Sequence, residues 1–444
     1  MKTLDMTTGR PSSLLLKFAF PMMLSMLLQQ CYNLCDSLLV GRFLGDVALT
    51  ATGSAGNFSW IAQNLVCCAI YGYGVALSQQ FGARDMDGYR RFLAGALVLT
   101  LFWGLLVTVV GTIHAETFLR LLKTPEQLVG AAAEYLRVLW VGFLALALMN
   151  LFSTALMSMG DSRTPLVALA ISSVVNILLD AVFLAWFHMG IGGAALATVI
   201  AQVFAAAWNL RALVLRGNAL PRRHHFRLRL PVMKELLRLS LPQMLSSVVI
   251  NSGDLLVQSI INGFGMAFVM GINAARRYFS MLNIVGYGLE CAVGTYAGQN
   301  WGAQKPDRIR QGTRFAVTLG FVSSAMTGIL VCLFAEPLIR FLLKDSSGDI
   351  IRVGVEALRV LAIFLPGLYL LCEFRAAIQG MGNVVYPMLS GFSELTMRIL
   401  ASLLLPLLVG RRGLYYVDAA AWIPTMLLMM IGYKATLKKH VPKS

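Results

Sequence analysis

Charged residues are scarce in this chain. Of its 444 residues, 13% are charged and 57% are hydrophobic, whereas soluble domains carry about 25% charged residues. So few charges cannot cover the surfaces of the two or three soluble domains that the length alone would suggest. The high hydrophobic content also excludes a disordered chain. The composition therefore predicts an all-α polytopic membrane protein.

The motifs of common enzymes are also missing. The sequence holds no phosphate-binding Walker loop, nucleophile elbow or HExxH motif. The five histidines fall at segment ends or in loops, and the seven cysteines lie inside apolar stretches, where we expect free, packed thiols. We therefore predict no enzymatic activity, no cofactor, no dedicated metal site and no ATP-driven step within this chain.

What the sequence does contain is a series of long apolar segments. A bilayer-spanning helix takes about 20 mostly apolar residues, and about twelve stretches qualify. They cover residues 15–40, 54–80, 92–113, 133–157, 165–187, 192–215, 236–262, 273–299, 314–334, 355–379, 387–409 and 414–437. Lys and Arg concentrate at both termini and in the even-numbered connections, which predicts cytoplasmic termini in the inner membrane. This bias also accounts for the net charge of +16 without any nucleic acid.

The two halves of the chain repeat each other. Pro21 corresponds to Pro242, and residues 79–83 (Gln-Gln-Phe-Gly-Ala) correspond to residues 299–303 (Gln-Asn-Trp-Gly-Ala). Further matches at nearly the same offset join 115–120 to 335–340, 136–139 to 358–361 and 159–165 to 381–387. Six helices per half is an even number, so both halves enter the membrane from the same side and form parallel repeats. We predict a six-helix bundle over 1–215, a basic cytoplasmic linker over 216–235 and a second six-helix bundle over 236–444.

Carboxylates inside the first half are the strongest functional candidates, because charge within a membrane is costly and rarely kept without a role. Asp36 follows Tyr32 and Asn33 by one helical turn, with Gln29 further along the same face, and Asp180 follows Asn176 by one turn. The direction of each helix also places Tyr135 and Thr198 at the depth of the two aspartates. We expect these groups to meet in the outer half of the first bundle.

Two carboxylates held close together share a proton, because like charges disfavour double ionisation. Such a pair can take up a proton on one side of the membrane and release it on the other. The same carboxylate, amide and hydroxyl oxygens also suit Na⁺. The alternative is that Asp36 and Asp180 face water or cap loops.

The second half carries charges whose roles the sequence leaves open. We expect Asp254 to line a cavity, Glu394 and Arg398 to neutralise each other four residues apart, and Glu373 and Arg375 to extend toward the membrane surface. No role follows for Glu290. In the first half, Pro21 interrupts the opening helix as either a functional hinge or a static kink.

The motifs named above resemble those of multidrug and toxic compound extrusion (MATE) transporters. Residues 21–45, the two Gln-rich runs at 79–83 and 299–303, and residues 159–165 with their second copy carry the resemblance over nearly the whole chain. It implies two six-helix bundles and antiport, in which H⁺ or Na⁺ enters while an amphipathic, often cationic compound leaves.

The pattern is most similar to the DinF-like branch of that family. Its first-lobe proton site corresponds here to Tyr32, Asp36, Tyr135, Asn176, Asp180 and Thr198, and its bending proline to Pro21. The resemblance implies that protonation of Asp36 bends the first helix and expels the substrate from a cavity that we expect Gln29, Asn33 and Asp254 to help line. The NorM-like branch relies instead on second-lobe carboxylates, and Asp254 and Glu373 match its pattern poorly.

We therefore predict a proton-coupled exporter of amphipathic cations that works by alternating access, as a monomer in the lipid bilayer. Na⁺ coupling through Asp36 and Asp180 is the first alternative. A flippase for lipid-linked sugars or cell-wall precursors is the second, although its cavity should be rich in arginine. A membrane scaffold or a channel is the third. The sequence names neither the substrate nor the conformation.

Overall fold

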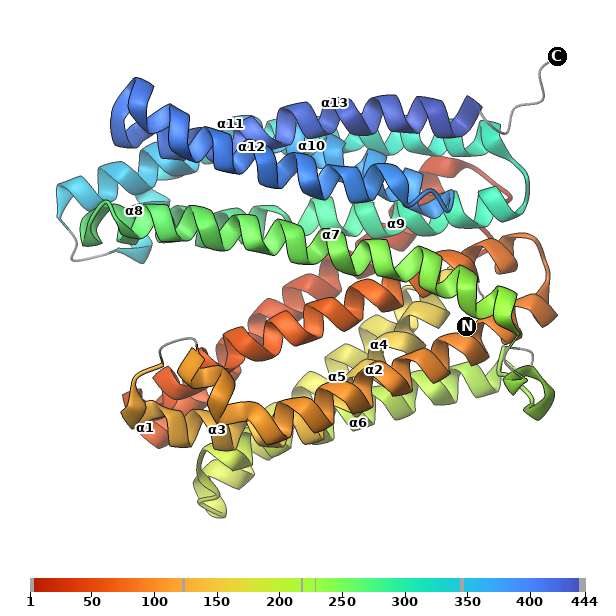
Figure 1. The fold of residues 1–444 in the computed structure, drawn as a ribbon, viewed down its shortest axis with the longest axis horizontal. Helices are drawn as coiled ribbons and strands as arrows, with labels where there is room; N and C mark the ends of the chain where they lie inside the picture. The colour runs from red at the N-terminus through yellow and green to blue at the C-terminus, as the bar shows by residue number, and fades with distance from the viewer. Residues whose placement is uncertain (1–3, 122–123, 217–218, 228, 344–346, 439–444) are drawn as a thin grey trace. The chain divides into compact units, whose positions relative to one another are not determined.

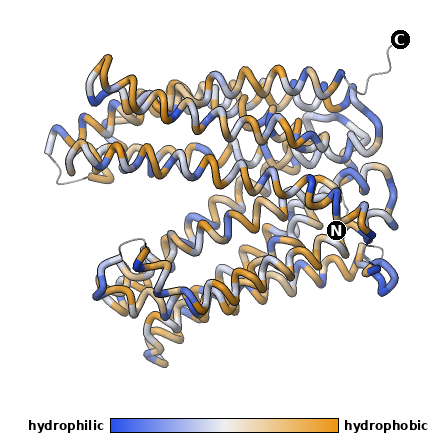
Figure 2. Tube along the Cα trace, in the orientation of Figure 1, coloured by the Kyte–Doolittle hydropathy of each residue, from blue (hydrophilic) through white to orange (hydrophobic). Residues whose placement is uncertain are grey.

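The computed structural model describes residues 4–121, 124–216, 219–227, 229–343 and 347–438. Within these residues the regular structure is helical (Figure 1). Among the described residues, eight helical segments are long and apolar enough to cross a membrane, or nine when the bent pair α3 and α4 counts as one span. Apolar residues run along the helices, whereas polar residues gather near many helix ends and connections (Figure 2). The all-α polytopic class predicted from composition is confirmed.

The first predicted segments form one continuous helical stretch. Helix α1 covers Pro11–Gly82 and is kinked at Gly45, whose φ of 83° lies in the left-handed region that only glycine adopts readily. The break between the two predicted spans therefore falls at this residue. Pro21, in contrast, lies within α1 without any break in the helical dihedral angles.

Contacts divide the chain into two compact units. Unit 1 comprises Met1–Asp5 and Phe20–Ser240, and unit 2 comprises Met6–Ala19 and Leu241–Ser444. Residues 6–19, which include the start of α1, thus belong to unit 2, while the rest of α1 belongs to unit 1. The change of unit falls next to Pro21 in α1 and next to Pro242 in α7.

Unit 1 contains most of α1 and the helices that follow it. These are α2 (Met86–Leu121), α3 (Glu126–Val141), α4 (Phe143–Ser158), α5 (Arg163–Ala181), α6 (Gly190–Leu215) and the first turns of α7 (Leu230–Asn262). Helices α3 and α4 bend by 47° at Gly142, so they divide one predicted span. Helix α6 packs against α3, α4 and α5, and the linker forms a short helical turn, η2 (Arg223–Phe226).

Unit 2 is organised around α11. Its helices after α7 are α8 (Met266–Leu282), α9 (Ile284–Gly302), α10 (Pro306–Leu342), α11 (Gly348–Gly380), α12 (Val385–Val409) and α13 (Val417–Lys438), with the turn η3 (Gly410–Tyr416) before α13. Helix α11 contacts α8, α9, α10 and α13. It is therefore enclosed by protein on several sides, and its C-terminal half, which includes Glu373, is largely buried.

The repeated motifs hold helix ends in place. Asp161 accepts hydrogen bonds from the backbone N–H groups of Arg163 and Thr164, each at 3.0 Å, and pairs with Arg216 at the end of α6. Its counterpart in the second copy, Asn383, accepts a bond from the N–H of Val385 at 3.0 Å. These polar residues satisfy N–H groups that a helix start leaves unpaired.

The run at 299–303 has a related structural role. Gln299 Oε1 accepts a hydrogen bond from the N–H of Met6 at 2.9 Å, and Asn300 Nδ2 donates to the Met6 carbonyl at 3.1 Å. Lys305 Nζ donates to the carbonyl of Thr7 at 3.0 Å. The motif thus fixes the segment that leads into α1 onto unit 2.

Candidate functional site

The polar residues predicted to meet in the first half do come together in unit 1. Tyr32 on α1 donates a hydrogen bond from its hydroxyl to Thr198 Oγ1 on α6 at 3.4 Å, and Asn176 Nδ2 on α5 donates to the same oxygen at 3.4 Å. Thr198 Oγ1 donates its own hydrogen bond to the carbonyl of Ala194 at 3.2 Å, which is why Tyr32 is the donor toward Thr198. One threonine oxygen therefore joins side chains from three helices.

Two carboxyl groups lie beside this junction. Asp36 and Asp180 are within hydrogen-bonding reach of each other, and the buried Tyr135 of α3 lies close to both. Asp180 and Asn176 are fully buried, with 0% exposure. Six residues from α1, α3, α5 and α6 thus form one cluster, which we call the aspartate cluster: Tyr32, Asp36, Tyr135, Asn176, Asp180 and Thr198.

The buried carboxylate oxygens of this cluster lack hydrogen-bond donors. In the described part of the protein, no hydrogen bond reaches either oxygen of Asp180 or the buried Oδ1 of Asp36, and no salt bridge reaches either residue. An unpaired charge buried in this way costs several kcal/mol. A proton shared between the two carboxyl groups, or a bound cation, would offset this cost.

A short π-helical segment follows Asp180. It is η1 (Val182–Trp186), and it directly continues α5. Such segments are rare and occur frequently at functional sites. Neither apolar periodicity nor spacing could reveal it, because its residues (Val, Phe, Leu, Ala and Trp) are those of any membrane-spanning helix.

The remaining first-half candidates lie on α1. Gln29 Nε2 donates to Asn33 Oδ1 at 3.2 Å, and Asn33 is exposed. The carbonyl of Pro21 accepts a bond from Ser25 Oγ at 2.9 Å. These residues are not in the aspartate cluster, and their roles in substrate binding and bending remain predictions.

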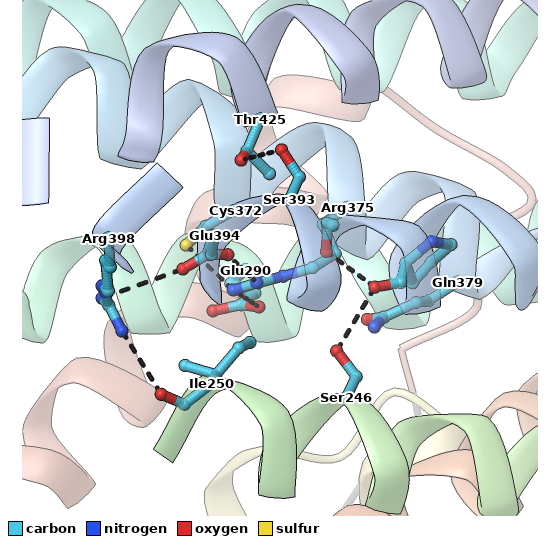
Figure 3. Close-up of polar contacts among 12 residues, drawn as sticks. Ser246, Ile250, Glu290, Cys372, Arg375, Gln379, Ser393, Glu394, Arg398 and Thr425 are labelled. Carbon is cyan, nitrogen blue, oxygen red and sulfur yellow. Dashed lines mark hydrogen bonds and ion pairs between the residues drawn. The ribbon is translucent and has the colours of Figure 1, made fainter. Parts of the chain in front are cut away.

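Unit 2 contains a second polar group, built as a network of ion pairs. Arg398 lies 2.9 Å from Asp254, 3.4 Å from Asp418 and 3.9 Å from Glu394. Arg375 lies 3.2 Å from Glu394 and 3.8 Å from Glu290 (Figure 3).

Arg276 completes the network by pairing with Asp418 at 3.7 Å. Three guanidinium groups thus face four carboxylates, and every one of these seven side chains has an oppositely charged partner. The expected pairing of Glu394 with Arg398 is present, although Asp254 is the nearer partner of Arg398. Asp254 is therefore half of an ion pair, although its side chain keeps 49% exposure.

Glu373 and Arg375 do not extend toward the membrane surface, so that prediction is wrong. Glu373 is 0% exposed, and neither of its carboxylate oxygens has a hydrogen-bond partner in the described residues. Its side chain lies against Gly320 of α10, where a Cβ atom would collide with it. The reason is the central place of α11 in unit 2, which position along the sequence does not reveal.

Asp87, His224 and His225 form the one group of potential metal ligands found among the described residues. His225 Nδ1 accepts a hydrogen bond from the N–H of Arg222 at 2.8 Å, so Nε2 carries the proton and donates to Asp87 at 2.9 Å. Both ring nitrogens are therefore occupied, and the remaining two residues are too few to hold a metal ion.

Comparisons with known protein families, relatives and solved structures agree with the architecture described above. The MatE family model matches this chain twice, over residues 21–182 and 242–404, which confirms the internal repeat. The chain belongs to the MatE family, and it is a multi-pass membrane protein.

Among individual relatives, the "Probable multidrug resistance protein YpnP" of Bacillus subtilis is 30% identical over 370 residues, 82% of each chain. The "DNA damage-inducible protein F" of Escherichia coli is 26% identical and covers 73% of this chain and 71% of its own. The solved structure "MATE in the bent conformation" has a TM-score of 0.93 at 22% identity and covers 99% of this chain and 98% of its own. At that identity the structural likeness shows the fold alone.

Proposed function

We propose that this protein is a secondary antiporter that exports amphipathic cations in exchange for protons by alternating access. The observation that supports this proposal most directly is the aspartate cluster, in which the buried carboxyl group of Asp180 and the buried Oδ1 of Asp36 lack hydrogen-bond donors in the described residues. A relative named as a probable multidrug resistance protein supports export of drug-like compounds. We place the protein in the inner membrane with both termini in the cytoplasm, following the distribution of Lys and Arg.

The cluster provides a simple basis for coupling. A single proton shared by Asp36 and Asp180 removes one of the two negative charges and gives one orphaned oxygen a donor. When that proton leaves, the pair carries two negative charges, and either a cationic substrate or the next proton offsets the second one. Binding of one therefore favours release of the other, as antiport requires. The hydroxyls of Tyr32 and Thr198 hold the site together from α1 and α6.

The conformational step falls to α1. Pro21 lacks the N–H that would bond the carbonyl of Lys17 one turn earlier, so the helix bends there at low cost. It also lies where α1 passes from unit 2 to unit 1. We propose that proton binding at Asp36, four turns beyond, changes the bend at Pro21 and thereby the access to the cavity that Gln29 and Asn33 help line.

Na⁺ coupling is a second candidate, favoured by one observation. The buried Oδ1 of Asn176 also lacks a donor, so amide and carboxylate oxygens are available together, and Na⁺ binds oxygen ligands. The paired charges of the network in unit 2 leave less room for an ion there, except at Glu373.

Transport by purified protein in liposomes distinguishes these candidates. Uptake of a fluorescent organic cation is followed under an inside-acid gradient and then under an outward Na⁺ gradient. We expect uptake driven by the pH gradient, lost in Asp36→Asn and kept in Glu373→Gln. Uptake driven only by the Na⁺ gradient would show that Na⁺, not H⁺, is the coupling ion. Loss of uptake in Glu373→Gln alone would place the coupling site in unit 2. Uptake under neither gradient would favour a lipid-linked substrate.

A further inference from the structure

A basic hollow lies in unit 1 where the linker meets the start of α7. The hollow is open to solvent and is lined by Arg91, His225, Arg227, Arg229 and Val232. A phosphate group would therefore lie at its mouth, against the side chains, rather than inside an enclosed cavity. Three of its five lining side chains are guanidinium groups, and the proposed transport mechanism uses none of them.

The linker is held firmly enough to position these arginines. The side chain of His225 is 0% exposed, and its Nε2–H donates to Asp87 at the start of α2 at 2.9 Å. The N–H of Arg222 donates to the other ring nitrogen at 2.8 Å. The linker is thus attached to α2 two residues before Arg227, which keeps that arginine close to Arg91.

The charge of the hollow is strongly unbalanced. Arg91 pairs with Asp87, which His225 also contacts. Arg227 and Arg229 form no ion pair with any carboxylate in the described part of the chain. With His225 neutral, one carboxylate faces three guanidinium groups, which leaves a surplus of about two positive charges. Guanidinium groups bind phosphate oxygens in a bidentate manner.

The surroundings favour a lipid as the source of that phosphate. The hollow lies at the ends of two membrane-spanning helices, α2 and α7, a position at the border of the bilayer. Phe226 and Leu230 alternate with the arginines and are 42% and 79% exposed. Apolar side chains at such a border enter the acyl region while adjacent basic groups meet the headgroups.

We propose that Arg91, Arg227 and Arg229 form a binding site for the phosphate of an anionic phospholipid headgroup. The lipid thereby attaches the linker to the membrane surface beside α2 and α7. This site is separate from the aspartate cluster and does not depend on the ion or the substrate that the protein transports.

Native mass spectrometry of the full chain in a nonionic detergent tests the site directly. The protein is titrated with phosphatidylglycerol, phosphatidylcholine and inorganic phosphate. We expect phosphatidylglycerol to bind more tightly than phosphatidylcholine and to be weakened about 30-fold in Arg227→Gln/Arg229→Gln, because each such arginine contributes about a fivefold effect near an anionic headgroup. Each single variant should lose about fivefold, which keeps the test informative if the double variant is unstable.

The matched control is Arg163→Gln/Arg211→Gln. Both arginines are exposed on unit 1, at the start of α5 and near the end of α6, so this variant loses the same charge at the same end of the membrane helices. It should bind phosphatidylglycerol like the wild type. If the control variant lost as much affinity for phosphatidylglycerol as the double variant, the loss would be due to overall charge, and the proposed site would be wrong. Binding of inorganic phosphate as tight as that of the lipid would overturn the assignment to a lipid.

Discussion

Replacing Asp180 by Asn should change the pH dependence of folding stability in a defined direction. Asp180 is fully buried, and neither of its oxygens has a donor in the described residues, so the native Asp36–Asp180 pair retains one proton that the unfolded chain releases above about pH 4. The native state then binds more protons than the unfolded state, and stability falls as pH rises. The slope is about 1.36 kcal/mol per pH unit, or about 2.7 kcal/mol between pH 5 and pH 7.

Asp180→Asn should remove this slope. The amide has nearly the same shape, stays neutral, and offers Asp36 an N–H donor in place of the shared proton. The difference in free energy of unfolding between the variant and the wild type should therefore grow in favour of the variant by about 2–3 kcal/mol from pH 5 to pH 7. Reversible chemical unfolding in detergent micelles at pH 5, 6 and 7 measures the free energy of unfolding of both proteins. Taking the difference between them cancels the contributions of the other titrating groups.

Asp46→Asn is the control for this comparison. Asp46 lies on α1 as well but is exposed, and its substitution should leave the wild-type slope unchanged. Parallel stability curves for the wild type and Asp180→Asn would show that the pair holds no extra proton, and the argument from the orphaned oxygens would fail.

Three further predictions concern the rest of the molecule. Pro21→Ala restores a backbone hydrogen bond in α1 and should slow transport several-fold in liposomes while cation binding persists; undiminished turnover would make Pro21 a static feature. Arg398→Met leaves the carboxylates of Asp254, Asp418 and Glu394 with fewer partners and should lower the free energy of unfolding by about 3–5 kcal/mol, with Arg398→Lys recovering part of it; a neutral effect would contradict the ion-pair network. Gly111→Ala places a Cβ against the ring of buried Trp140 and should destabilise the protein by about 1–3 kcal/mol. In Gly130→Ala the added Cβ meets no atom within 4 Å, so this variant should be neutral or more stable. Equal thermal midpoints for the two glycine variants would refute the packing argument.

The sequence predicted the class of fold well because membrane helices carry a simple signal. Each needs a long apolar stretch, and the repeat shows that both halves share one plan. The predicted helix ends agreed less well with the ends in the structure. The kink at Gly45 depends on one backbone angle, and the division of α3 from α4 at Gly142 depends on packing, so neither changes the apolar pattern.

The aspartate cluster was accessible from the sequence because its members follow each other at helical spacing and because chain direction gives their depth. The network in unit 2 was largely missed. Arg276 and Asp418 lie far apart in the sequence, and no helical period joins them. The repeat does contain a useful signal, since Arg398 follows Asn176 by 222 residues and Asp254 follows Asn33 by 221. Positions that are neutral amides in the first half are therefore charged in the second.

Glu373 shows the limit of judging burial from position along a helix. Its place near one end of an apolar segment suggests access to the membrane surface, yet the helices around α11 enclose it fully. Such burial depends on which helices are neighbours, and neighbours are a property of the fold.

The most direct test of the central claim is a count of protons released when the protein binds a cation. Purified protein in weakly buffered detergent solution is titrated with tetraphenylphosphonium while a pH-indicator dye records free protons. We expect about one proton to be released per cation bound by the wild type and by Asp254→Asn, and none by Asp36→Asn or Asp180→Asn. Cation binding without proton release in the wild type, or unchanged release in both aspartate variants, would contradict coupling through Asp36 and Asp180.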